Sequence, residues 1–136
     1  MKILLISPPN INVLEPFISS LRPPTKFLWG FPIGLGYLGS FLEVNNFDVE
    51  ILDACNDELD ISTTEKRIVQ SRADVIGINT LTATVKTVVV IAQIVKKLNP
   101  TMPIIAGGVH ATYDYQNLLK NYPIDFVVLG KERLLY

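Results

Sequence analysis

The sequence predicts an α/β fold in which five parallel strands form a doubly wound sheet with helices on both faces. Two observations predict it: short apolar runs rich in Ile, Val and Leu recur along the chain, and helix-like stretches separate them. Alternating strands and helices with short links favour a parallel sheet, and right-handed crossovers leave few strand orders. The expected order is the flavodoxin-like (Rossmann-like) 2-1-3-4-5.

Each expected strand is a short apolar run bounded by polar or turn-forming residues. The runs are "KILLIS" (2–7), "DVEILD" (48–53), "DVIGIN" (74–79), "PIIAG" (103–107) and "DFVVLG" (125–130). The first run ends at Pro8 and Pro9, so it is too short for a signal-peptide core or a membrane span. We expect it to be a buried strand.

Helix-like stretches separate these strands, at residues 32–46, 63–72, 84–100 and 113–123. In the first stretch, one apolar stripe is formed by Leu35, Leu38, Phe41 and Leu42. Pro32 suits the start of this helix, and Asn45–Asn46 suits its end. The stretch at 84–100 is the clearest helix, because its apolar residues share a face and Lys96 and Lys97 lie where the helix dipole favours cations.

Two regions depart from the regular alternation. Residues 8–31 form a long connection without clear periodicity, which includes Phe27, Trp29 and Phe31. The chain also reaches "KERLLY" soon after the fifth strand, and the helix expected next is missing or truncated. We therefore expect residues 1–136 to be a single domain, an N-terminal fragment of a longer protein. The sheet face left uncovered is an expected homodimer contact.

Composition and charge exclude several classes of partner. The chain has 136 residues, 49% of them hydrophobic and 18% charged, with a net charge of -1. It has no basic excess for nucleic acid and no polybasic run for an anionic membrane, so neither is expected as a partner. Cys55 is the only cysteine, which excludes an internal disulfide and suits a cytoplasmic location.

In an open parallel sheet, ligands bind beyond the carboxyl ends of the strands. The segments expected there are "SPPN" (7–10), "DACN" (53–56), "NTLTAT" (79–84), "GGVHAT" (107–112) and "GKE" (130–132). The absence of clustered acids after the first strand argues against a receiver-like domain. No serine or cysteine is visibly paired with His110, so no catalytic residue is assigned to the chain.

The segment after the third strand carries small polar side chains, namely Asn79, Thr80, Thr82 and Thr84. These groups suit a polar ligand, and the amides at the start of the following helix suit a phosphate. The alternative is an ordinary helix cap made by Thr82 or Thr84. The residues alone leave both interpretations open.

The segment after the fourth strand contains Gly107–Gly108, which permits a close approach of ligand to backbone, or a positive φ. The alternative is a tight turn from strand to loop. "GLGYLG" (34–39) matches the dinucleotide pattern G-x-G-x-x-G only superficially, because it lies inside an expected helix. Asp53 and Asp114 are carboxylates near this edge, and Asp114 is expected at a helix N-terminus.

Together these segments resemble the cobalamin-binding domain at the N-terminus of many radical S-adenosylmethionine proteins, the class B methyltransferase-like family. The matching pieces are "ILLISPPN", "GFPIGLGYLGSFLEVNNFDVEILDA", "DVIGINTLTAT", "IIAGGVHAT" and "IDFVVLGKE". They run in register from Met1 to Glu132, and no single piece is decisive. The resemblance implies that cobalamin is held against the carboxyl edge of the sheet, its nucleotide tail along Gly107–Gly108.

The resemblance also implies a set of cofactor-binding residues, none of which ligates the metal. They are Ser7, Pro8, Pro9, Asn79, Thr80, Leu81, Thr82, Gly107, Gly108, Val109, His110 and Gly130. It further implies that the chain alone has no catalysis. S-adenosylmethionine and an iron–sulfur cluster would belong to a downstream radical S-adenosylmethionine domain, its expected partner in a parent methyltransferase.

The sequence departs from the wider cobalamin-binding pattern at several points. The Asp-x-His-x-x-Gly that supplies a cobalt ligand in methionine-synthase-like relatives is absent, so cobalamin is expected base-off without a histidine lower ligand. Asn79 stands where Ser-x-Leu is more common, "GKERLLY" replaces a "GEGE"-like end, and the cluster-binding Cys-x-x-x-Cys-x-x-Cys is missing.

Two other functions remain open from the residues. The chain could be an interaction domain that kept the fold and lost the ligand, an interpretation that Asn79 and Lys131 favour slightly. It could also be a flavodoxin-like nucleotide-binding protein or enzyme that uses Asp53 and His110. In the cobalamin interpretation, His110 lies on the loop after the glycines and lines the site without ligating cobalt, and Cys55 is a small buried or edge residue.

Overall fold

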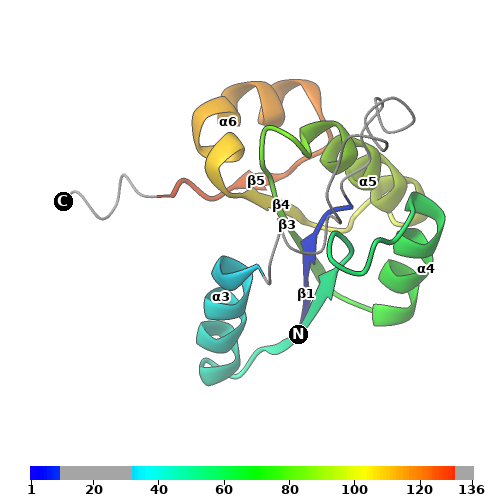
Figure 1. Cartoon of the computed structure of the whole chain (residues 1–136), viewed down its shortest axis with the longest axis vertical. Helices are drawn as coiled ribbons and strands as arrows, with labels where there is room; N and C mark the ends of the chain where they lie inside the picture. The colour runs from blue at the N-terminus through cyan, green and yellow to red at the C-terminus, as the bar shows by residue number, and fades with distance from the viewer. Residues whose placement is uncertain (10–31, 131–136) are drawn as a thin grey trace, which may run out of the picture.

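The computed structural model describes residues 1–9 and 32–130, and it confirms the expected fold class. One sheet of five parallel strands has the order β2-β1-β3-β4-β5 (Figure 1). The elements are β1 (Lys2–Ser7), α3 (Ile33–Val44), β2 (Asp48–Asp53), α4 (Ile61–Ser71), β3 (Val75–Asn79), α5 (Val85–Leu98), β4 (Ile104–Gly107), α6 (Val109–Asn121) and β5 (Phe126–Val127).

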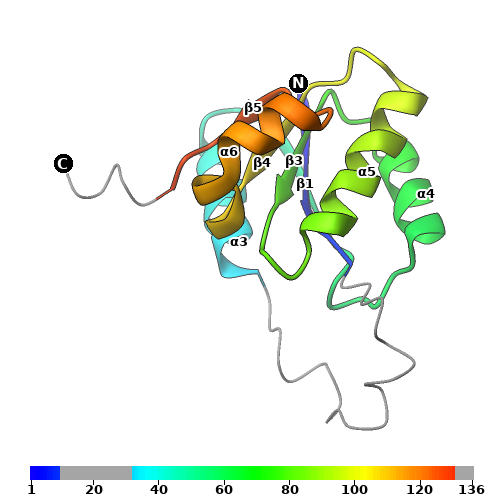
Figure 2. The same cartoon turned by 90° about the horizontal axis from the view of Figure 1, so that it is seen from above.

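One face of the sheet carries the main core. Side chains alternate between the two faces of a strand, so every second residue of β1, β3 and β4 points to the same side. On the core side these residues are Leu4, Ile6, Ile76, Ile78, Ile104 and Ala106, all fully or almost fully buried. They share one cluster with side chains of α4, α5 and α6, such as Ile68, Ile91 and Leu118. These three helices therefore cover this face, and Figure 2 shows α4 and α5 side by side on it.

Within the described residues, the opposite face of the sheet is covered by α3 alone (Figure 1). This helix lies against β2 and β1, and its Leu35 and Gly39 are buried. Two members of the apolar stripe expected in this helix remain exposed: Leu38 is 43% exposed and Phe41 66% exposed. The physical reason is that α3 packs only against the sheet. Its apolar stripe is wider than this contact, so part of the stripe remains exposed.

The helix ends follow local capping rules. Asp60 precedes α4, and its carboxylate accepts a hydrogen bond from the Thr63 amide at 2.7 Å, which lowers the pKa of Asp60. Asn45 caps the end of α3 and Asn46 adopts a positive φ of 68°, as expected for the asparagine pair. Lys96 and Lys97 lie in the last turn of α5.

An ion pair fixes the amino-terminal edge of the sheet. Lys96 Nζ donates to the Asp125 carboxylate at 2.7 Å and to the Met102 carbonyl at 2.7 Å, and Asp125 also accepts from the Ile104 amide at 2.8 Å. Burial raises the pKa of Asp125, but the hydrogen bonds from Lys96 and Ile104 outweigh it, and the net pKa is lowered. This contact joins α5 to the start of β4, at the end of the sheet opposite the expected site.

Two expected boundaries near the carboxyl edge are wrong. The helix expected at 113–123 begins at Val109, because Gly108 turns the chain from β4 straight into α6 and leaves no loop. His110 is therefore a helical residue, and Asp114 lies within the helix at a kink (φ −112°, ψ 21°) instead of at its N-terminus. The fifth strand, expected at 125–130, pairs only over Phe126–Val127.

Part of the sequence lies outside the described residues. It includes Phe27, Trp29 and Phe31 of the long connection, and Lys131 and Glu132 of the last expected edge segment. In the part of the chain that the structure describes, no helix is both long enough and apolar enough to cross a membrane.

Candidate functional site: a glycine-lined groove and an edge pocket

An apolar groove of about 400 Å³ lies on the sheet face that α3 only partly covers. Its walls are α3 on one side and the exposed face of β1, β3, β4 and the β5 end on the other. Fourteen residues line it, namely Ile3, Leu5, Gly34, Leu35, Leu38, Leu42, Val75, Gly77, Ile78, Asn79, Ile105, Gly107, Gly108 and Val128. Nine are aliphatic, four are glycines, and Asn79 is the only one with a polar side chain. The volume is in the usual range for small-molecule sites, about 300–1,000 Å³.

Two strands carry glycine on the groove side of the sheet. Gly77 in β3 and Gly107 in β4 occupy positions where the alternation would otherwise place side chains over the sheet. A Cβ on Gly107 would have Val128 Cβ as its nearest neighbour, at 3.9 Å, so the space above Gly107 is open. Leu5 leans over Gly77, where an added Cβ would lie 2.9 Å from Leu5 Cδ2.

Gly108 is required by a different constraint, its backbone conformation. Its φ of 103° and ψ of −178° lie in a region that is essentially restricted to glycine. A Cβ at this position would lie 2.5 Å from Asn79 Oδ1 and 2.9 Å from the Thr80 carbonyl oxygen. The backbone around it is held by hydrogen bonds from the Thr80 amide to Gly107 O at 2.7 Å and from the His110 amide to Thr80 O at 3.1 Å. The chain after β3 and the start of α6 are thus locked together.

Asn79 lies at the mouth of the groove, at the carboxyl end of β3 and in register with Gly107. Its carboxamide has no hydrogen-bond partner among the described residues, whereas no fully buried side-chain polar atom of these residues lacks one. The amide offers one acceptor and two donor hydrogens. Asn79 is therefore the polar group of the groove that is available to a ligand.

A second, smaller pocket of about 170 Å³ lies at the carboxyl edge of the sheet. It is lined by Ser7, Pro8, Pro32, Cys55, Asn56, Asn79, Leu81 and Thr84. These residues come from the ends of β1, β2 and β3, next to the point where the strand order reverses, which is where open α/β sheets bind ligands. Asn79 lines both the pocket and the groove, so the two hollows are neighbours.

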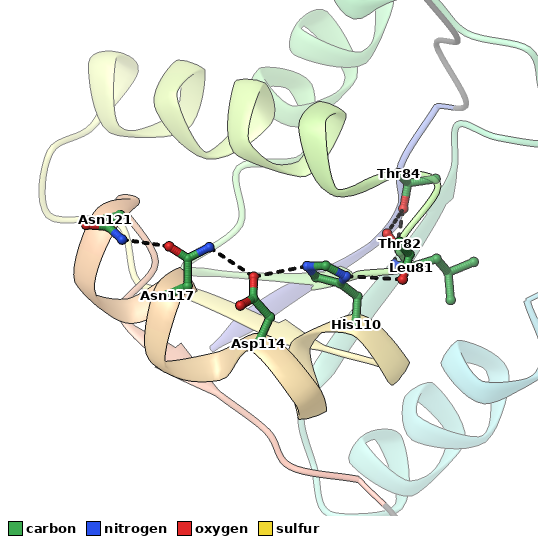
Figure 3. A network of polar contacts seen from close by, with 7 residues as sticks. All are labelled: Leu81, Thr82, Thr84, His110, Asp114, Asn117 and Asn121. Atoms are coloured by element: carbon green, nitrogen blue, oxygen red, sulfur yellow. Dashed lines mark hydrogen bonds and ion pairs between the residues drawn. The ribbon is translucent and has the colours of Figure 1, made fainter.

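His110 belongs to a chain of polar contacts that runs along α6 (Figure 3). Its Nδ1 lies 3.2 Å from Thr82 Oγ1, and its Nε2 lies 3.2 Å from Asp114 Oδ2. Asn117 Nδ2 donates to the same Asp114 oxygen at 3.0 Å, and Asn121 Nδ2 donates to Asn117 Oδ1 at 2.6 Å. The imidazole thus joins the chain after β3 to α6.

The partners of His110 define its hydrogen-bonding state. A carboxylate only accepts, so in the neutral ring Nε2 carries the hydrogen and donates to Asp114, and Nδ1 accepts from the Thr82 hydroxyl. Both ring nitrogens are therefore occupied.

Thr84 occupies the N-cap position of α5, but its hydroxyl contacts the backbone of Leu81 and not the amides of the helix. The alternative in which the Thr84 side chain caps this helix is therefore wrong.

The described residues contain no preformed metal centre, and the Asp53 carboxylate is hydrogen-bonded locally. No group of three or more His, Cys, Asp or Glu side chains comes together within residues 1–9 and 32–130. The Asp53 carboxylate accepts hydrogen bonds from the backbone and side chain of Asn56, at 3.2 Å and 2.8 Å. Cys55 is half-buried in the edge pocket, as expected for an edge residue.

The structure brings together some of the residues expected from the sequence and not others. The two hollows collect Ser7, Pro8, Asn79, Leu81, Gly107 and Gly108. Pro9 and Thr80 are buried beside them, and Val109 is exposed. Thr82 and His110 contact each other, and the Gly130 amide donates to Thr112 Oγ1 at 3.0 Å. Sequence reasoning missed the α3 wall and Gly77, although a glycine inside an apolar strand is a signal of close approach.

Comparisons with known proteins agree with this architecture. Residues 28–135 match the family described as the B12 binding domain. An uncharacterized methyltransferase of Pyrococcus horikoshii is 30% identical over 137 residues, which cover 100% of this chain and 28% of that protein. An anaerobic magnesium-protoporphyrin IX monomethyl ester cyclase of Rubrivivax gelatinosus is 29% identical over 102 residues, which cover 74% of this chain and 18% of that protein.

The chain thus spans less than a third of the length of either relative. No solved structure matches it.

Proposed function

The chain belongs to the B12-binding domain family, and from this premise we propose that it is the cobalamin-binding module of a larger enzyme. The observation that carries the proposal is the apolar groove whose mouth is formed by Asn79, Gly107 and Gly108 at the carboxyl edge of the sheet. Cobalamin has two parts with different needs: a wide corrin ring around cobalt, and a nucleotide tail that ends in a flat base.

The groove fits the nucleotide tail. The face of β3 from Val75 to Asn79 gives it a length of about 13 Å, at about 3.3 Å per residue. Gly107 leaves an open space on its floor, and a side chain at this position would project into that space. The walls of Leu35, Leu38 and Ile105 suit a flat apolar base.

The mouth of the groove and the edge pocket suit the polar parts of the cofactor. The Asn79 carboxamide can donate to or accept from the ribose and phosphate that leave the groove. The lining of the pocket beside it includes Pro8 and Leu81, which offer an apolar surface to the edge of the corrin, and the hydroxyls of Ser7 and Thr84. Thr80 contributes through its backbone, which holds Gly107 and His110 in position.

A tail that lies in the groove cannot also coordinate cobalt, so the bound cofactor is base-off in this proposal. His110 does not replace the tail as a lower ligand, because its Nε2 and Nδ1 already contact Asp114 and Thr82. The sequence contains no other histidine. Cobalamin supplies, when bound, a cobalt centre able to carry a methyl group; the residues of this chain hold it and take no proton from a substrate.

The larger enzyme is proposed to be a radical S-adenosylmethionine protein, and a methyltransferase in particular. The Pyrococcus horikoshii relative is named a methyltransferase, which supports methyl transfer as the reaction of the larger enzyme. That relative is much longer than this chain, which supports the presence of further domains. In that arrangement S-adenosylmethionine and the iron–sulfur cluster belong to a separate domain, downstream of the domain formed by residues 1–136. The single cysteine of this chain suits the reducing cytoplasm.

The experiment that tests the proposal measures cobalamin retained by the purified chain. The chain is mixed with hydroxocobalamin or methylcobalamin and desalted, and the absorbance spectrum is recorded. We expect retained cobalamin with a base-off spectrum, and the same spectrum from His110→Ala. Loss of colour on desalting, with no spectral change on titration either, would mean that the chain is a ligand-free scaffold of the same fold.

A graded pair of variants tests whether the groove is the site. Gly107→Ala adds one carbon and Gly107→Val adds three to the open space above β4. Valine suits a strand, so neither change is expected to unfold the chain. Cobalamin affinity should fall in the order glycine, alanine, valine, while far-ultraviolet circular dichroism and the melting temperature stay close to those of the native chain. Equal affinity in all three would place the tail elsewhere.

A further inference from the structure

The distribution of polar groups along the groove determines which cobamides it can bind well. Cobamides share the corrin ring and differ in the base that ends the nucleotide tail, which is dimethylbenzimidazole in cobalamin and a purine such as adenine in others. The two kinds of base are both flat and bicyclic. A site that separates them must therefore sense hydrogen-bonding groups more than size.

The inner part of the groove offers no polar side chain to a base. Its far end lies among Ile3, Leu42 and Val75, and its middle between Leu35, Leu38 and Ile105. No hydroxyl, amide or charged group enters this region from the described residues, since Asn79 stands at the mouth at the carboxyl end of β3.

The backbone under the groove is also engaged. β1 pairs with β3, and β3 with β4, in continuous parallel ladders along the groove floor. At the mouth, the carbonyl of Gly107 accepts from Thr80, and the carbonyl of Gly108 accepts from Thr112. Along the inner part of the groove, the backbone groups of these described strands are therefore engaged with one another and not with the ring nitrogens or the amino group of a purine.

We infer that this groove selects cobamides with a benzimidazole-type base over those with a purine base. The inference rests on the proposed function. A purine placed in the groove exchanges hydrogen bonds with water for contacts with leucine, isoleucine and valine, whereas dimethylbenzimidazole buries only hydrocarbon at the same edge. One buried polar group left unpaired weakens binding by roughly tenfold, so a purine with several should bind at least that much more weakly.

The inference is tested by comparing the dissociation constants of cobalamin, adeninyl cobamide and cobinamide, which has no nucleotide. Cobalt is first reduced to Co(I) under anaerobic conditions. This form binds no lower ligand, so both bases are detached from cobalt in solution. Their unequal affinity for cobalt therefore does not affect the measured dissociation constants. Free and bound cofactor are separated by ultrafiltration and quantified by absorbance. We expect cobalamin to bind at least tenfold more tightly than adeninyl cobamide.

A matched pair of variants tests whether the groove produces this difference. Val75→Thr places a hydroxyl of nearly the same shape at the inner end of the groove, and Val90→Thr makes the same change on the exposed side of α5. Val75→Thr should reduce the ratio of the two dissociation constants severalfold, and Val90→Thr should leave it unchanged. Circular dichroism checks that both variants remain folded.

The outcomes separate this inference from the proposal on which it rests. Equal binding of cobalamin and adeninyl cobamide would overturn the base selectivity and leave cobalamin binding in place. Cobinamide binding as tightly as cobalamin would also overturn it, because the tail would then contribute nothing. Failure of all three to bind would overturn the proposed function itself.

Discussion

Replacing Gly108 with alanine should destabilise the fold, because two independent features of this position exclude a Cβ. The first is its backbone conformation, with φ 103° and ψ −178°, which costs a non-glycine residue about 1–3 kcal/mol. The second is contact, since the added carbon would lie 2.9 Å from the Thr80 carbonyl oxygen. Moving that carbonyl weakens the hydrogen bond that it accepts from His110, which contributes about 1 kcal/mol.

These terms together predict a loss of about 2–4 kcal/mol in the free energy of unfolding for Gly108→Ala. Urea unfolding followed by circular dichroism measures it. With a typical m value of about 2 kcal/mol per molar urea, the midpoint should fall by about 1–2 M. The neighbouring Gly107→Ala is the control, because its Cβ would have 3.9 Å of clearance and a strand conformation.

Gly107→Ala should change the stability by less than about 1 kcal/mol, and in the stabilising direction if the gain in strand propensity dominates. The reasoning is refuted if Gly108→Ala unfolds at the same urea concentration as the native chain. It is also refuted if the two alanine variants lose the same amount, because the strained backbone would then not be the cause.

Two further variants test the ion pair at the amino-terminal edge and the wall of the groove. Asp125→Asn should lower the free energy of unfolding by about 1 kcal/mol at neutral pH, a small amount because the ion pair with Lys96 is partly solvated. The pKa of Asp125 is lowered in the folded state. The stability that Asp125 contributes is therefore present above the unfolded pKa and is lost as the pH falls through the folded pKa. Urea midpoints of variant and native chain should therefore converge in acid, and a gap that widens on acidification would contradict this. Leu38→Gln changes the groove wall and should weaken cobalamin binding severalfold in the same ultrafiltration assay. Tyr37→Gln changes an exposed residue of the same helix outside the groove and should not weaken binding. Equal effects of the two variants would show that α3 is not part of the site.

The sheet was predictable because each strand carries its own signal. The runs at 2–7 and 48–53 coincide with β1 and β2 residue for residue, since both are apolar segments bounded by residues that end a strand. The strand order followed from the alternation with helices and the handedness of crossovers. The fifth strand is shorter than expected because an edge strand is held by pairing on one side only, and hydrophobicity does not report where pairing stops.

The candidate site was predictable only in part. The carboxyl ends of the strands were predictable, and with them Asn79 and Gly107–Gly108, because topology places them at one edge. The groove was not, since it depends on what α3 leaves uncovered and on Gly77 facing the same side as Gly107, which are tertiary properties. The position of His110 was wrong because the turn at Gly108 is tight enough to start a helix at once, a backbone effect with no separate sequence signal.

The most direct test of the central claim is the electron paramagnetic resonance spectrum of Co(II) cobalamin bound to the chain. Unpaired spin on Co(II) is split by a nitrogen that coordinates it, so the spectrum reports whether the tail base or His110 is a lower ligand. With the tail in the groove and both nitrogens of His110 occupied, we predict a spectrum without nitrogen superhyperfine splitting. A bound cofactor that shows this splitting would contradict the account.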